Sequence, residues 1–278
     1  MLLWSIALVC LAIAAGICLG CGAFAGLTWL WLLPASFLGL FLLGLALAFF
    51  FLWAMCKRVD KSVPQEQDSP FYRRMATAYI DAIITLARVR IKTAGLEKTP
   101  KEGRFLLVCN HLSIADPVLL LWAFRHSQLA FISKKENDDM FLVGDVMHKL
   151  QCQLLDREND RQALRVILKC ISIIKEDKAS VCVFPEGWCS TDFKLHRLRP
   201  GVFKIAQKAN VPIAVCTVRN TQSVIPSLLK LKPSHVELRL VDVIPPEELT
   251  GLSTVEVSDR VYRLMADDLG EELVAEDT

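Results

Sequence analysis

The absence of charge from the first 56 residues constrains the fold more than any other feature of the chain. No Asp, Glu, Lys or Arg precedes Lys57, and the stretch is almost entirely apolar. A helix needs about 20 apolar residues to cross the hydrocarbon core of a bilayer. The stretch is therefore long enough for two membrane-spanning helices with a short turn between them. We expect these helices over residues 3–23 and 36–54.

Two other interpretations of this apolar stretch fit less well than a hairpin. A cleaved signal peptide would begin with positive charge and would not be followed at once by a second apolar segment. A single tilted helix would leave many apolar residues unaccounted for. The predicted turn lies where Gly22, Gly26, Thr28, Pro34 and Ser36 gather, with Trp29 and Trp31 as anchors at the far interface.

Lys57, Arg58 and Lys61 follow the second apolar segment directly. Positive residues beside membrane helices tend to stay in the cytoplasm. We therefore predict a transmembrane hairpin over residues 1–56 and a domain over residues 57–278 on the cytoplasmic face of a multi-pass membrane protein. The cysteines beyond the apolar stretch are scattered without a CxxC pair, which indicates reduced thiols rather than a disulfide framework or a metal site. The sequence has no basic tract that would indicate nucleic-acid binding.

Apolar runs alternate with helical patterns throughout the second part of the chain. This alternation predicts an α/β domain, a mostly parallel sheet flanked by helices. In open sheets of this kind, ligands bind beyond the carboxyl ends of the strands. The predicted strands are 88–93, 104–109, 129–133, 152–155, 180–184, 213–218 and 236–240; the predicted helices are 71–87, 117–124, 138–149, 161–176, 202–209 and 258–269.

A histidine and an aspartate follow the strand that ends at Cys109. His111 and Asp116 are five residues apart, and a loop between them could bring the side chains into contact. Asp116 would then hold the imidazole in one tautomer and leave the other ring nitrogen free as a general base. The structural alternative is that Asp116 caps the helix that Pro117 begins.

Three further signals are weak when taken singly. Glu186 and Gly187 follow a buried strand, where a tight turn with a solvated carboxylate is the alternative to a functional site. Arg157 follows another strand and has a planar group suited to phosphate, although a surface ion pair with Asp156 or Glu158 would explain it equally. A basic cluster is either a binding site for an anionic headgroup or a solvated face; its members are Lys194, Arg197 and Arg199.

Taken in order, these signals resemble the glycerolipid acyltransferase family, which includes the lysophosphatidic acid acyltransferases. The resemblance covers residues 88–219. Its blocks are Asn110-His111-x4-Asp116, Asp156-Arg157, Phe184-Pro185-Glu186-Gly187 and Val211-Pro212-Ile213, with the lead-in IKTAGLEKTP at residues 91–100.

The resemblance implies that His111 is the general base and Asp116 its partner. It also implies a substrate-binding set of Asn110, Arg157, Glu186 and Gly187. Where the family often has Thr-Arg-Ser after the glycine, this chain has Trp188-Cys189-Ser190. Since that departure removes a phosphate ligand, the basic cluster at residues 194–199 is the candidate replacement.

The implied reaction moves a fatty acyl group from acyl-CoA or acyl-carrier protein to the free hydroxyl of 1-acyl-glycerol-3-phosphate. The product would be phosphatidic acid for phospholipid biosynthesis. The expected partners are membrane lipids, the lysophospholipid acceptor and the thioester donor, with no cofactor, no metal and no nucleic acid.

Three alternatives stay open at this stage. The acceptor could be another lysophospholipid or a lipid alcohol. The chain could be a non-catalytic lipid-binding protein that keeps the fold. A metallohydrolase with His111 and Asp116 as ligands would need further ligands, and the other four histidines form no recognisable pattern.

Overall fold

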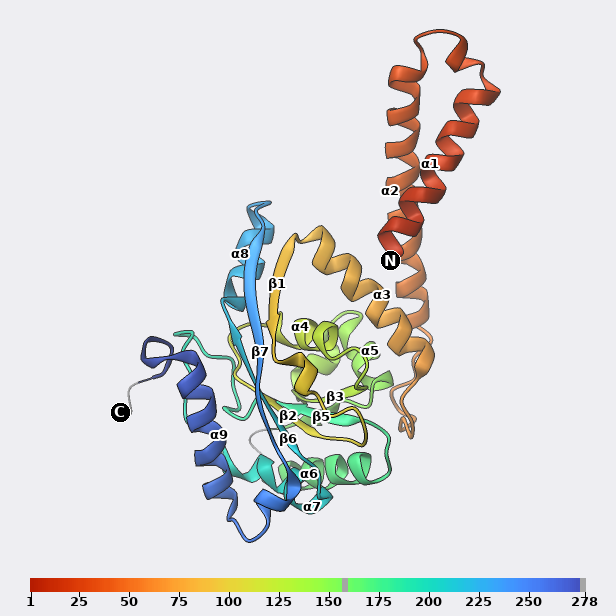
Figure 1. Ribbon diagram of the computed structural model, residues 1–278. Coiled ribbons are helices and arrows are strands. Elements are labelled where there is room, and N and C mark those ends of the chain that lie inside the picture. The colour runs from red at the N-terminus through yellow and green to blue at the C-terminus, as the bar shows by residue number, and fades with distance from the viewer. Residues whose placement is uncertain (157–159, 276–278) are drawn as a thin grey trace. The chain divides into compact units, whose positions relative to one another are not determined.

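The computed structural model describes residues 1–156 and 160–275 of the chain. The chain divides into two compact units, Met1–Ser62 and Val63–Thr278. The first unit contains two long helices in contact with each other, and the second contains a seven-stranded sheet with helices on both faces (Figure 1).

The apolar unit is a helical hairpin, as predicted. Its helices are α1 (Leu2–Gly20) and α2 (Trp29–Cys56), and both are long and apolar enough to cross a membrane. They approach closely at Gly44, where an added Cβ would lie 2.7 Å from Cγ2 of Ile6. The turn begins at Gly22, whose φ of 66° belongs to the left-handed region that glycine adopts most easily.

The predicted start of the second helix at residue 36 is wrong, since α2 begins at Trp29. Pro34 and Ser36 lie inside the helix instead of in the turn. A proline removes one backbone donor, so the helix loses a single bond near its first turns and continues through a strongly apolar sequence. The hydroxyl of Ser36 donates to the carbonyl of Leu32 at 2.6 Å. This serine is therefore satisfied within the helix and does not mark a turn. Trp29 and Trp31 consequently lie in the first turn of α2.

The sheet confirms the predicted fold class. Strands β2, β3, β4, β5 and β6 run parallel to one another; β7 is antiparallel to β6, and β1 is parallel to β7. The order across the sheet is β1-β7-β6-β2-β5-β3-β4. The strands are β1 (Val89–Ala94), β2 (Leu106–Cys109), β3 (Leu129–Lys134), β4 (Gln153–Leu155), β5 (Ser180–Val183), β6 (Ile213–Arg219) and β7 (Ser234–Ile244).

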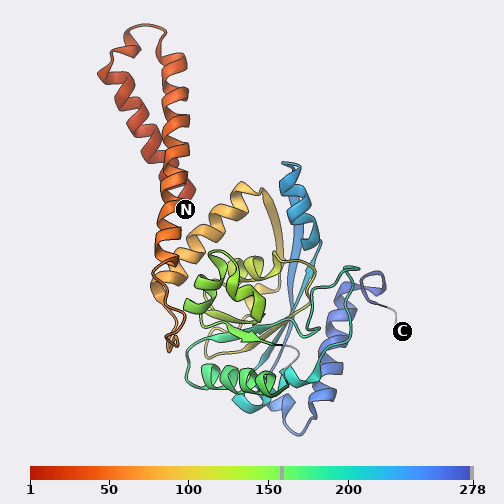
Figure 2. The ribbon, with the colours of Figure 1, turned by 180° about the vertical axis from the view of Figure 1, so that it is seen from behind.

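Helices cover both faces of this sheet, and the alternation of side chains along β2 shows why. Leu106 and Val108 pack with α6 (Asp160–Lys175), α7 (Lys204–Ala209) and α9 (Thr254–Leu269). Leu107 and Cys109 point to the other face. The helices α3 (Pro70–Leu86), α4 (Asp116–Ala123), α5 (Val143–Lys149) and α8 (Val224–Leu229) belong to that second layer (Figures 1 and 2).

Short 3-10 turns complete the description, and two further elements differ from those predicted. The expected helix over 138–149 is divided into a 3-10 turn and α5, with Leu142 at a φ of 64° just before α5. Helix α8 was not predicted. The 3-10 turns are Ala23–Ala25, Leu96–Lys98, Lys135–Asp139, Pro200–Phe203, Thr221–Ser223, Pro246–Leu249 and Glu271–Leu273.

Candidate active site

The carboxyl ends of β2, β5 and β6 lie side by side, and the loop after β2 brings His111 to Asp116. Nδ1 of His111 lies 2.8 Å from Oδ2 of Asp116. The same oxygen accepts the backbone N–H groups of Leu112 at 2.7 Å and Ser113 at 2.8 Å. Both of these backbone donors belong to the loop that precedes α4. Asp116 is the first residue of α4 and makes no capping bond to it, which rules out the helix-cap alternative.

The imidazole of His111 is held in place while one of its nitrogens stays free. The ring stacks on Phe184 with centroids 4.0 Å apart and planes 16° apart, and the side chain is 17% exposed. Its Nε2 has no hydrogen bond to any residue that the structure describes. Since Nδ1 faces a carboxylate, Nδ1 carries the proton in the neutral ring and Nε2 is the basic nitrogen. Asp116 is fully buried, and its second oxygen has no partner among the described residues.

Glu186 is not the solvated turn residue of the structural alternative, because its side chain is buried. Oε1 accepts the backbone N–H of His111 at 2.9 Å, and Oε2 accepts that of His196 at 3.0 Å. Burial raises the pKa of this carboxyl to about 7, although the two backbone bonds act in the opposite direction. Glu186 thus connects the loop after β5 to the backbone of His111.

The loop after β5 requires a glycine at position 187, directly after Glu186. The φ of Gly187 is 85°, and an added Cβ would lie 2.6 Å from Nε of Arg199. The guanidinium of Arg199 lies over the ring of Trp188, 5.9 Å from the centroid. The structure therefore places Arg199, from the predicted basic cluster, beside the residues that follow Glu186.

Asp192 organises the far part of the same loop. Its Oδ1 accepts from the hydroxyl of Ser190 at 2.7 Å and lies 2.9 Å from Nε2 of His196. These contacts, the one with His196 first, lower the pKa of Asp192 to about 2. The N–H of Ser190 donates to the carbonyl of His111 at 2.8 Å. The loop is thereby attached to His111 through both Glu186 and Ser190.

The remaining predicted binding residues are Lys194, Arg197 and Arg157. Lys194 is half-buried and its ammonium group has no ion pair with a described residue, whereas Arg197 is exposed. Arg157 lies outside the described residues. Within residues 1–156 and 160–275, no three His, Cys, Asp or Glu side chains are grouped so that they could hold a metal ion.

Asn110 fixes the ends of two neighbouring strands. Its side chain is buried, donates to the carbonyl of Val218 at 3.0 Å and accepts the N–H of the same residue at 2.8 Å. The amide is therefore used for positioning, and His111 follows directly from this fixed point. The predicted contact of Asn110 with substrate stays a prediction, for a side chain that is 1% exposed.

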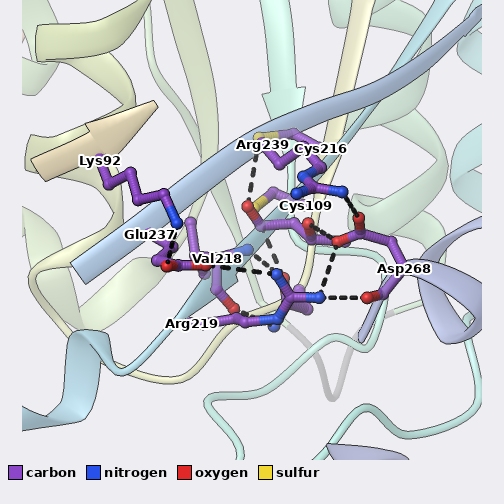
Figure 3. A network of polar contacts seen from close by, with 10 residues as sticks. Lys92, Cys109, Cys216, Val218, Arg219, Glu237, Arg239 and Asp268 are labelled. Atoms are coloured by element: carbon purple, nitrogen blue, oxygen red, sulfur yellow. Dashed lines mark hydrogen bonds and ion pairs between the residues drawn. The ribbon is translucent and has the colours of Figure 1, made fainter. Parts of the chain in front are cut away.

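An ion-pair network next to Val218 was missed by sequence reasoning. The buried carboxylate of Asp268 lies 3.2 Å from Arg219 and 2.9 Å from Arg239, and it accepts from the hydroxyl of Thr217 at 2.6 Å (Figure 3). The network attaches the end of β6 to α9. No local signal could have found it, because its members are separated by up to 51 residues.

Comparison with known proteins decides the family. An acyltransferase family model matches residues 90–219, which include the His111–Asp116 pair and Glu186. Residues 90–219 of this chain form an acyltransferase family domain. The resemblance drawn from the sequence motifs is thereby confirmed.

Relatives of this chain occur in organisms as different as Mycoplasma pneumoniae and Chlamydomonas reinhardtii. A probable 1-acyl-sn-glycerol-3-phosphate acyltransferase of Mycoplasma pneumoniae is 28% identical over 64% of this chain and 67% of its own length. The 1-acyl-sn-glycerol-3-phosphate acyltransferase of Chlamydomonas reinhardtii is 27% identical, over 74% of this chain and 62% of its own. The chain thus spans about two thirds of the length of these relatives.

A solved structure has the same fold as this chain. The crystal structure of the 1-acyl-sn-glycerophosphate acyltransferase of Thermotoga maritima matches with a TM-score of 0.58. The match covers 74% of this chain and 84% of that chain, at 23% sequence identity. At that identity, the likeness is one of architecture.

Proposed function

We propose that the protein transfers a fatty acyl group from a thioester to the free hydroxyl of 1-acyl-glycerol-3-phosphate. The observation that carries the proposal is the 2.8 Å contact between Nδ1 of His111 and Oδ2 of Asp116, with Nε2 left free. The matched family supplies the class of reaction, and the names of several relatives point to this acceptor.

In the proposed mechanism, Nε2 of His111 takes the proton of the acceptor hydroxyl as its oxygen attacks the thioester carbonyl. Asp116 stabilises the resulting imidazolium and keeps the ring from turning. The tetrahedral intermediate then collapses, the carbon–sulfur bond breaks, and the imidazolium returns its proton to the leaving thiolate. The ester and the free thiol are the products, and no acyl-enzyme forms.

We assign the acceptor phosphate to Arg199 within the basic cluster. Its guanidinium lies beside Gly187, one residue after the carboxylate that binds the backbone of His111. A planar guanidinium binds phosphate oxygens in pairs, which a lysine cannot do. This assignment replaces the arginine that family members often have after the glycine and this chain lacks. Arg157 remains a proposed second ligand.

We further propose that residues 1–56 are a membrane anchor and residues 57–278 the catalytic domain on the cytoplasmic side. Two helices have the length and composition to span a bilayer, and positive residues follow the second of them. An acceptor with a long acyl chain stays in the bilayer, so an anchored enzyme would meet it there.

A panel of acceptors tests the proposal. Membranes carrying the protein are given a radiolabelled acyl-CoA, or acyl-carrier protein, with lysophosphatidate, lysophosphatidylcholine, lysophosphatidylglycerol or monoacylglycerol. Labelled phosphatidate is expected as the main product. A product with a different headgroup would correct the acceptor, and no transfer to any lipid would contradict the enzymatic proposal in favour of lipid binding alone.

A further inference from the structure

The catalytic unit carries an exposed apolar surface of its own at one end of the sheet. Leu229 and Leu231 are 80% and 79% exposed, and Leu86, at the end of α3, is 55% exposed. We call these three residues the apolar tip. Exposed apolar side chains that cluster on the surface of a domain mark a site of contact with a membrane or with another protein.

Two segments that are far apart in the sequence meet at the apolar tip. β1 and β7 are paired from Val89 and Ser234 onward, so the residues just before each strand are neighbours. The guanidinium of Arg88 donates to the carbonyl of Leu231 at 3.1 Å. Figures 1 and 2 both show the end of α3 and the end of α8 at the same end of the sheet.

The turn after α8 holds its leucines outward. The N–H of Leu231 donates to the carbonyl of Leu228 at 3.0 Å, and that of Lys232 donates to the carbonyl of Ser227 at 2.9 Å. Leu231 has a φ of 54°, in the left-handed region that is strained for a leucine. Because Val224 packs in the cluster with Ile80 and Ile84, α8 is fixed on the domain and cannot turn to bury the leucines.

The charged residues that flank the apolar tip in the sequence are all positive. Arg88, Lys230 and Lys232 are exposed beside the leucines. No Asp or Glu occurs within residues 82–96 or 220–236. Lysines interleaved with exposed leucines fit the interface of an anionic bilayer, where the apolar groups enter the acyl region and the ammonium groups meet phosphates.

We propose that the apolar tip is a membrane-contact site of the catalytic unit and inserts into the interface of an anionic lipid bilayer. Helix α8 begins five residues after β6 ends at Arg219, and that end of β6 is fixed to Asn110 beside His111. The contact would therefore hold the active-site edge of the sheet against the phase in which a lipid acceptor dissolves. It acts independently of the apolar hairpin.

Photo-crosslinking to lipid tests the site in the full-length protein. Leu231 is replaced by benzoylphenylalanine, and the protein is reconstituted into phosphatidylcholine vesicles with or without phosphatidylglycerol. Leu168 of α6, which is 56% exposed and does not belong to the tip, receives the same substitution as a matched control. After irradiation, lipid adducts are counted by mass spectrometry.

We expect lipid adducts at position 231 well above those at position 168, and more of them when phosphatidylglycerol is present. The pair Lys230→Ser and Lys232→Ser should lower the yield in anionic vesicles at least about fivefold. Equal yields at 231 and 168 would overturn the proposal. Adducts at 231 to a second copy of the chain would also overturn it, since the surface would then join protein to protein.

A second measurement relates the contact to turnover and rests on the proposed function. The paired substitution Leu229→Ser and Leu231→Ser should raise KM for an acceptor supplied in vesicles and leave kcat for a short-chain soluble acceptor unchanged. An unchanged KM would mean that the tip does not deliver substrate. If the wild type is inactive on both acceptors, the proposed function fails while the crosslinking result still stands.

Discussion

Two buried carboxylates near His111 are stabilised by the same kind of contact but have different roles. Asp116 and Glu186 both accept backbone N–H groups. Asp116 also contacts the imidazole of His111, whereas both oxygens of Glu186 are occupied by the backbone. On this geometry we infer that Asp116 acts on the reacting base and that Glu186 is a positioning residue.

Glu186→Gln tests the positioning role through stability and its pH dependence. The new amide nitrogen would face a backbone N–H and leave it unpaired, so we expect the free energy of unfolding to fall by about 1–3 kcal/mol. The raised pKa, from 4.5 to about 7, means that the folded wild type binds more protons than the unfolded chain between these values. Its stability should therefore fall as pH rises through this window.

Thermal unfolding of the detergent-solubilised protein at several pH values between 4.5 and 7 measures both effects. The difference between wild type and Glu186→Gln should shrink as pH rises, because Gln does not titrate. A difference that grows with pH would show that Glu186 is stabilised as the carboxylate and that its pKa is not raised.

For individual residues, the sequence predicted the pair of His111 and Asp116 but not the backbone contacts of Glu186. The spacing of His111 and Asp116 after a strand indicates a loop that can close on itself, which is a local property. The partners of Glu186 are backbone N–H groups on two different loops. Such partners depend on where neighbouring strands end, and no side-chain pattern records them.

Among the elements, the loop after β5 has the tightest steric requirement. Gly187 combines a φ of 85° with an Arg199 side chain in the space of its missing Cβ. Gly103 has a similar φ of 71° with nothing within 4 Å of an added Cβ. Substitutions at the two glycines can therefore be compared to distinguish the effect of backbone strain from the effect of displacing Arg199.

Gly103→Ala should cost about 1–2 kcal/mol of stability and leave turnover intact. Gly187→Ala should cost at least as much and also raise KM for the acceptor, because Arg199 has to move. Steady-state kinetics and thermal unfolding of both variants check this. Equal KM values in the two variants would remove Arg199 from the acceptor site.

The strands were easier to predict than the helical ends. Every predicted strand has a counterpart, and the central strands β2, β5 and β6 were the clearest because they are apolar runs followed by turn residues. Helix α8 was missed because Pro226 and the sequence around it are typical of a loop. The start of α2 was placed seven residues late because Pro34 and Ser36 look like turn residues until the apolar context is considered.

The whole molecule combines an apolar hairpin with a sheet domain that can be understood separately. Fifty-six residues without charge precede the first lysine, and α1 and α2 pack through Gly44. If both helices span a bilayer, the protein behaves as an integral membrane protein. The apolar tip alone would give only a reversible contact.

Extraction of membranes distinguishes these two cases. We expect the full chain to stay in the pellet after an alkaline carbonate wash and to dissolve in detergent. A peripheral protein of the same membranes serves as the control for the wash. Release of the chain with that control would mean that the hairpin lies on the membrane surface or against another protein.

The central claim is that His111, oriented by Asp116, removes the proton of the acceptor hydroxyl. The most direct measurement compares the acyl-transfer rate of His111→Ala with that of His196→Ala, since His196 lies in the same loop system and its ring faces Asp192 instead. We predict a fall of at least about 100-fold for His111→Ala and a much smaller change for His196→Ala. A His111→Ala protein that folds and transfers acyl groups at the wild-type rate would contradict the account.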